Sequence, residues 1–286
     1  MSVKKLARTT KRIEDWRAKW TPSILEEGIA DHLAELEAPD HSGLHCGALS
    51  ALAGYYGIMA EYGQLHRGDT RMCKENMYRM GWCQWAVCRW PDQEANRTRA
   101  HFNGYTMLAF HGAVIADADE TFLKELGDLL RRPEYQTNFK LKAVNAMLSG
   151  DRALIALALG EDENVIRSQA EKALADLESL KSVRKGAPVE LRILLDILNG
   201  DGGALNEHLK ESVSYDRSSR DRVNFMDWHA IACAKIAMRR GLEVTVDTED
   251  CPLSLSRPAD MDYSGLELPR PKYGFPWERY EAEPSP

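Results

Sequence analysis

Three short connections of the same kind constrain the fold of this chain more than any other feature of its sequence. In each, a leucine is followed within a few residues by Gly-Asp, at Leu65–Asp69, Leu148–Asp151 and Leu198–Asp201. Glycine just beyond a helix accepts the left-handed backbone that closes it, and aspartate is a preferred N-cap of the next helix. Because helical patterning flanks all three sites, they predict tight helix-to-helix turns.

The segments between these turns indicate an all-α fold. Nearly every segment before about residue 242 has the periodicity of an amphipathic helix, and none has the alternation of a strand. Thr21-Pro22 combines an N-cap with a first-turn proline, and Arg239-Arg240-Gly241 is a helix stop. We expect helices at about residues 10–19, 22–37, 43–66, 69–90, 93–116, 119–132, two shorter ones flanking Gly150-Asp151, then 163–184, 188–200, 204–214 and 223–241. Close approach of two backbones is expected in the small-residue helix around Gly54 and Gly57.

The C-terminal residues have a different character. Residues 242–286 hold seven of the 12 prolines, together with apolar side chains such as Leu255, Tyr263 and Phe275. A disordered tail would carry fewer apolar residues, so we expect an extended arm that frays after about Tyr280. The predicted organisation is a helical bundle or an irregular α-solenoid of helical hairpins over residues 1–242. A proline-rich arm over residues 243–286 packs against it.

The distribution of charge favours a basic protein partner. Of the net charge of −7, residues 1–20 contribute +5 from seven basic and two acidic side chains, so the remainder sums to −12. An acidic body disfavours nucleic acid, because surfaces that bind it are basic. It favours a basic protein, since complementary charge speeds encounter and rejects wrong partners.

Hydropathy and cysteine use predict a cytoplasmic protein with no membrane association. The longest apolar stretch, His101 to Ala116, is interrupted by polar residues and falls short of the roughly 20 apolar residues of a membrane span. The basic N-terminus has no apolar segment behind it, so we expect no secretory signal. Six scattered cysteines do not form a disulfide framework, and free buried thiols are the simplest interpretation.

Two acidic groups are the candidate partner-binding residues. The helix after Pro22 carries only acidic charges on one side, and a second group follows Ala116. Such faces are most often solvated, and carboxylates also bind hard cations, but a single-signed face suits a basic protein. The predicted binding residues are Glu26, Glu27, Asp31, Glu35, Asp117, Asp119 and Glu120. We predict no cofactor and no bound metal.

Other constellations have simpler structural interpretations. His41 and His45 have the i, i+4 spacing of a chelating pair but lack the glutamate of a zinc-protease motif. Cys83 and Cys88 lie about 140° apart on a helix, so they do not chelate one ion easily. Tryptophans 82, 85 and 90 have too few basic neighbours for a base-stacking groove and are expected in the core. His229 follows Asp227, but no marked nucleophile accompanies this pair.

The segment Phe225 to Gly241, FMDWHAIACAKIAMRRG, with the following Leu-Glu-Val and proline-bearing tail, resembles the helical immunity protein 49 family. The small-residue segment Gly43 to Gly57, GLHCGALSALAGYYG, is similar as well. The resemblance covers about a quarter of the chain and assigns no individual residue a role. It implies a bacterial polymorphic-toxin immunity protein that binds and neutralises a cognate antibacterial toxin, often a nuclease, without catalysis of its own.

Two other classes of function remain open. A helical-repeat scaffold would explain the three Gly-Asp turns, although their separations of 82 and 50 residues are not one period. An all-α enzyme would need histidines dispersed in the sequence to meet in one pocket. The histidines concerned are His41, His45, His101, His111 and His229.

Overall fold

The computed structural model describes residues 14–16, 18–39, 44–90, 99–130, 142–180, 186–215 and 226–281. These residues form α-helices and one short π-helix, with no strand among them, so the all-α prediction is confirmed. Within the same ranges no helix has the length and apolarity needed to cross a membrane.

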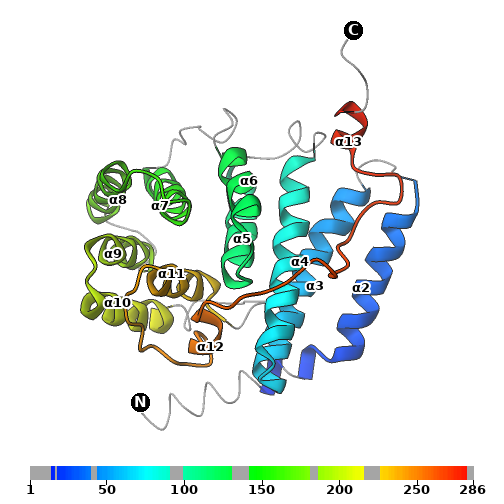
Figure 1. The fold of residues 1–286 in the computed structure, drawn as a ribbon, viewed down its shortest axis with the longest axis horizontal. Helices are drawn as coiled ribbons and strands as arrows, with labels where there is room; N and C mark the ends of the chain where they lie inside the picture. The colour runs from blue at the N-terminus through cyan, green and yellow to red at the C-terminus, as the bar shows by residue number, and fades with distance from the viewer. Residues whose placement is uncertain are drawn as a thin grey trace.

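The first group of helices packs in chain order (Figure 1). It consists of α2 (Pro22–Glu37), α3 (Leu44–Tyr62), the π-helix η1 (Gly63–Arg67), α4 (Thr70–Arg89), α5 (Arg99–Ile115) and α6 (Glu120–Leu130). Helix α3 lies between α2 and α4, and α4 packs in turn on α5. Each helix therefore contacts its neighbours in sequence, as stacked hairpins do.

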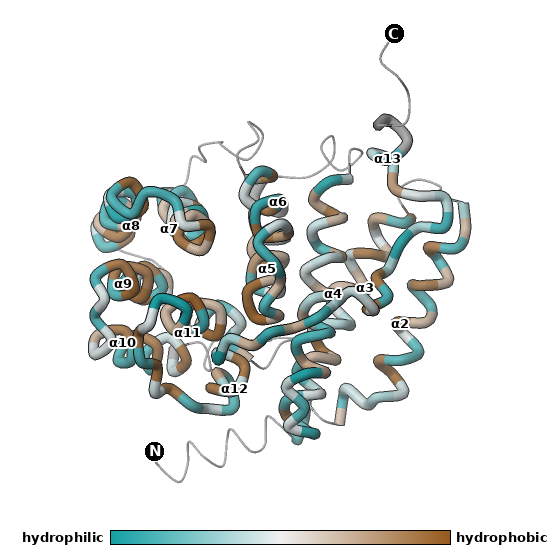
Figure 2. The backbone as a smooth tube through the Cα atoms, viewed as in Figure 1, coloured by the Kyte–Doolittle hydropathy of each residue, from teal (hydrophilic) through white to brown (hydrophobic). Residues whose placement is uncertain are grey.

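The second group is a stack of two further hairpins, seen at the left of Figure 1. It contains α7 (Lys142–Ala158), α8 (Glu163–Glu178), α9 (Gly186–Asn199) and α10 (Gly202–Tyr215). Helix α11 (Trp228–Arg239) packs against both α5 and α9, so it joins the two groups. Figure 2 shows long hydrophobic stretches on α5, α9 and α11. Their buried side chains belong to one continuous core.

Two of the three Gly-Asp turns form as predicted, and the third does not. Gly68 (φ 61°) and Gly200 (φ 69°) end their helices, and Asp69 and Asp201 cap the following ones through hydrogen bonds of 2.9 Å. Gly150 instead lies inside the continuous helix α7, so the prediction of two short helices there was wrong. A Cβ at Gly150 would lie 2.7 Å from Leu191. The glycine makes room for α9 rather than ending a helix.

The close approach of two helix backbones occurs at a different place from the one predicted. Gly54 on α3 is exposed, and a Cβ there would meet nothing within 4 Å. Helices α4 and α5 cross instead at Gly81 and Gly112. A Cβ on Gly112 would lie 2.7 Å from the carbonyl oxygen of Met77 and 3.1 Å from the Cα of Gly81.

The segment after α11 runs back across the first group of helices as an extended arm (Figure 1). It contains only the short helices α12 (Leu253–Ser256) and α13 (Pro276–Glu281). Hydrogen bonds to α4 and α2 fix the backbone of the arm. Trp82 donates to the carbonyl of Pro269 at 3.3 Å. The N–H of Lys272 donates to the carbonyl of Leu36 at 3.0 Å. The predicted fraying after Tyr280 concerns residues mostly outside the described part of the chain.

Candidate functional site

The outer face of α2 carries a row of acidic side chains. Leu25 and Leu36 are fully buried and fix the inner face against the rest of the first group. The helix has 16 residues and contains neither lysine nor arginine. Its predicted binding residues Glu26, Glu27 and Asp31 are exposed, and Glu35 is half-exposed. The exposed side of α2 therefore carries carboxylates and no lysine or arginine, together with the exposed apolar residues Ile24 and Leu33.

Two carboxylates at the edges of α2 have partners within the chain. Glu35 lies 2.9 Å from the Nδ1 atom of His32, one turn earlier on the same helix. Glu37, at the end of the helix, lies 3.6 Å from the Nζ atom of Lys272 on the arm. Glu26, Glu27 and Asp31 precede both of them on the helix and are exposed, so they form its acidic surface.

The second predicted group divides between surface and interior. Asp119 and Glu120 are exposed at the start of α6. Asp119 caps that helix by accepting a hydrogen bond of 2.9 Å from the backbone N–H of Phe122. Asp117, only two residues earlier, has a side chain that is 3% exposed. We therefore remove Asp117 from the candidate surface and keep Asp119 and Glu120.

Asp117 is the centre of a buried cluster of charges. Its carboxylate accepts hydrogen bonds from Lys74 at 2.7 Å, Lys235 at 2.6 Å and Arg239 at 2.9 Å. Lys235 is fully buried and also donates to the carbonyl of Ile115 at 2.7 Å. The cluster ties α4 and α11 to the turn after α5, and sequence inspection did not detect it.

The cluster shifts the protonation equilibria of its own members. Burial lowers the pKa of Lys235 to about 7 and the charge of Lys74 adds to that effect, while Asp117 opposes it. Burial alone would raise the pKa of Asp117, but Lys235 and Lys74 outweigh it and hold that pKa below its usual value. The carboxylate of Asp117 thus accepts hydrogen bonds from two lysines and an arginine. This is a structural arrangement and not an exposed binding site.

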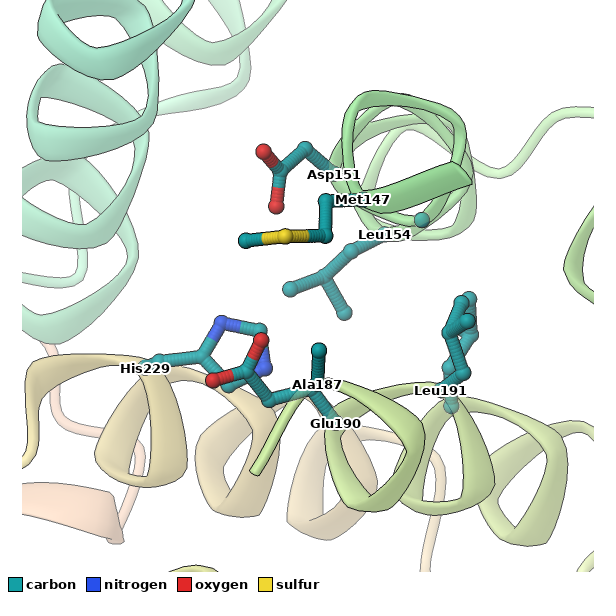
Figure 3. A pocket seen from close by; sticks show the side chains of 9 residues that line it. Met147, Asp151, Leu154, Ala187, Glu190, Leu191 and His229 are labelled. Carbon is teal, nitrogen blue, oxygen red and sulfur yellow. The ribbon is translucent and has the colours of Figure 1, made fainter. Parts of the chain in front are cut away.

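Two of the five histidines considered for an enzyme site meet, and Figure 3 shows the surroundings of one of them, His229. The rings of His111 and His229 are 5.3 Å apart, and the Nε2 atom of His229 lies 3.4 Å from the Sγ atom of Cys233. His229 also lines a cavity between α7, α9 and α11, opposite Asp151 and beside Glu190 (Figure 3). The cavity volume is about 20 Å³, which is room for a single water molecule.

Of the other three histidines, only His45 has a described side chain, and it does not join this pair. His45 is buried and lies 2.7 Å from the carbonyl of Ala38, so it secures the end of α2. His41 and the side chain of His101 lie outside the described residues. No group of three or more His, Cys, Asp or Glu side chains in the described part of the chain is placed to hold a metal ion. All six cysteines are buried and none forms a disulfide, and Cys83 and Cys88 are among them.

No protein-family model, curated protein or solved structure matches this chain. The resemblance to immunity proteins therefore stays a prediction, and the function has to be argued from the surface itself.

Proposed function

We propose that this protein is an immunity protein that binds and neutralises a basic antibacterial toxin, a nuclease effector, by stoichiometric association. The observation that carries the proposal is the outer face of α2, where Glu26, Glu27 and Asp31 are exposed on a helix without lysine or arginine. A nuclease needs a positive surface for its substrate. An acidic helix that covers such a surface competes directly with the nucleic acid.

The charge of the whole chain supports the same proposal. The net charge is −7 although the first 20 residues contribute +5. Asp119 and Glu120 add exposed carboxylates at the start of α6. Because opposite charge steers encounter over distances of about a Debye length, the acidic surface favours rapid capture of a toxin at low ionic strength.

The first experiment is a pull-down from the lysate of the native bacterium with tagged protein, followed by mass spectrometry. We expect one basic protein in stoichiometric amount, with its toxic activity blocked in the complex. The cells must express the genes that neighbour the gene of this protein. Recovery of no basic protein from such cells would contradict the proposal.

Charge reversal then tests the α2 face itself. Replacing Glu26, Glu27, Asp31 and Glu35 with lysine should slow association with the recovered partner by about tenfold or more at low salt, and less at high salt. The matched control has the same change in net charge on exposed carboxylates elsewhere, namely Glu171, Glu207, Glu243 and Glu249 to lysine. Equal effects of the two variants would show that net charge matters and the α2 face does not.

A further inference from the structure

An open cleft of about 540 Å³ lies between α4, α6 and the arm. Its walls are aromatic and come from three separate segments of the chain, namely Tyr78, Trp82, Trp85, Phe122, Phe275 and Trp277. Pockets that hold small ligands in proteins have volumes of about 300–1,000 Å³. The cleft is therefore large enough for a side chain and the peptide segment that carries it.

The walls of this cleft already stack two guanidinium groups of the protein itself. The guanidinium of Arg89 lies 4.8 Å from the ring centre of Trp85 and 4.9 Å from that of Trp277. Arg270 lies 5.2 Å from the ring centre of Trp82. A cation within about 6 Å of an aromatic face is attracted by the ring quadrupole. The aromatic walls therefore already hold two planar cations, both of which belong to the protein itself.

Carboxylates outnumber the guanidinium groups in the lining. Asp119, Glu125 and Glu278 face Arg89 and Arg270, so the charged lining sums to −1. Glu278 pairs with Arg270 at 3.2 Å. Glu125 lies as far as 4.0 Å from Arg89 and its side chain is 46% exposed. Its carboxylate is accordingly placed to receive a further donor from outside.

We propose that this cleft takes an arginine side chain from the basic partner, so that the guanidinium lies between the aromatic walls and donates to Glu125. The proposal rests on the proposed function, because it assumes a basic protein partner. Arginine fits better than lysine, since its planar group stacks on rings and matches a carboxylate with two parallel donors. A nucleobase fits less well, because base-stacking grooves have a positive track and this lining is negative.

The probe is a capped peptide, Gly-Arg-Gly-Arg-Gly, titrated at about physiological salt, where long-range attraction is screened. Binding is followed by the indole N–H signals in NMR spectra. The equivalent lysine peptide keeps the charge and loses the planar group, and the citrulline peptide keeps the shape and loses the charge. We expect the arginine peptide to bind at least about threefold more tightly than either control and to shift the signals of Trp82, Trp85 and Trp277.

Two variants locate the binding. Glu125→Gln should weaken the arginine peptide by about threefold to fivefold, because an exposed pair is lost. Thr121→Trp should abolish binding, since Thr121 lines the cleft and a large ring there fills it. The control is Asp128→Asn, which removes an exposed carboxylate of the same helix that does not line the cleft. It should leave the affinity unchanged.

Equal binding of the arginine and lysine peptides, or no binding of either, would overturn this assignment. So would a loss of affinity in Asp128→Asn equal to that in Glu125→Gln. Failure of the arginine assignment can be distinguished from failure of the inhibitor proposal. If the pull-down recovers a basic toxin whose affinity is unchanged by Thr121→Trp, the inhibitor proposal stands and the cleft has no part in it. If no basic partner exists while the arginine peptide still binds, the cleft recognises arginine and the inhibitor proposal fails.

Discussion

Among the described residues, Asp117 is the one carboxylate that pairs with Lys74, Lys235 and Arg239, and its own side chain is 3% exposed, so its charge is important for stability. Its φ of 57° is left-handed, a conformation that asparagine also tolerates. Asp117→Asn therefore removes the charge and leaves the backbone preference. We expect it to reduce the free energy of unfolding by about 3 kcal/mol, since breaking a buried ion pair strands the partner charges. Chemical denaturation measures this loss.

The control for that variant is Asp119→Asn, two residues further on. Asn and Asp are about equally good N-caps, so the exposed carboxylate of Asp119 should be replaceable at a cost within about 0.5 kcal/mol. Similar losses in the two variants would mean that the buried cluster contributes nothing beyond an ordinary surface charge.

His111 predicts a loss of stability in mild acid. It is buried, and its Nε2 atom has no hydrogen-bond partner among the described residues. Burial, and to a lesser degree His229, lowers its pKa well below the usual value. Between that lowered pKa and about 6.5 only the unfolded chain binds the proton. Stability from this group is therefore complete above about pH 6.5 and decreases as the pH falls, by up to about 1.4 kcal/mol per pH unit.

The measurement is the free energy of unfolding at several pH values between about 7 and 5, for the protein and for His111→Leu. The difference between the two curves isolates the histidine from the carboxylates that titrate at lower pH. A wild-type slope that persists unchanged in the variant would contradict the prediction.

The sequence could not show that Asp117 is buried in a cluster of charges, and the reason is physical. Lys74, Asp117 and Lys235 come from three segments, each of which looks locally like an ordinary charged helix or turn. Their burial follows from how α4, α5 and α11 meet. By contrast, Asp119 as an N-cap and Glu26, Glu27 and Asp31 as exposed residues depend only on local spacing, and those placements were predictable.

At the scale of elements, α4 and α5 can cross closely because Gly81 and Gly112 have no side chains at the crossing. Ala is better than Gly in a helix by about 1 kcal/mol, so Gly112→Ala would stabilise an isolated α5. In the folded chain its Cβ meets backbone atoms of α4, which do not move without separating the helices. We expect a net loss of about 1–3 kcal/mol, as in other overpacked cores. Thermal unfolding provides the measurement.

Gly54→Ala on α3 is the matched control, for which we expect a gain in stability instead of a loss. A Cβ there meets nothing within 4 Å, so the helix propensity should act alone and stabilise by up to about 1 kcal/mol. If both alanines changed stability in the same direction, packing at the crossing would not be the deciding term.

The glycines also show where element boundaries can be read from sequence. Gly68 and Gly200 are followed by aspartates that cap the next helix, so each turn is encoded by adjacent residues. Gly150-Asp151 has the same pair of residues, yet α7 continues through it, and the side chain of Leu191, 41 residues later, occupies the space beside the glycine. The real turn lies at Gly160 (φ 71°), where Asp162 caps α8. A Gly-Asp pair in the sequence does not reveal whether a side chain from another helix packs against the glycine.

At the scale of the whole molecule, the arm closes the side of the first group that the helices leave open. Phe275 is 1% exposed and stacks on Trp277 with ring centres 4.4 Å apart, over the tryptophans of α4. The hydroxyl of Tyr263 donates to the carbonyl of Ala116, beside the buried charge cluster. The arm therefore covers apolar surface and a main-chain polar group together.

Truncation after Arg257 tests this role while keeping α12 and the carbonyl that accepts from Lys74 at 3.2 Å. Loss of Phe275 alone removes about 2–3 kcal/mol of apolar burial, so the midpoint of thermal unfolding should fall by several degrees. The core is continuous from α3 to α11, and α11 contacts both groups of helices. The truncated protein should therefore still unfold in one transition, with exposed tryptophans that bind a hydrophobic dye in the native state. An unchanged midpoint would mean that the arm adds nothing to stability, and two separate transitions would mean that the arm, and not α11, couples the two groups.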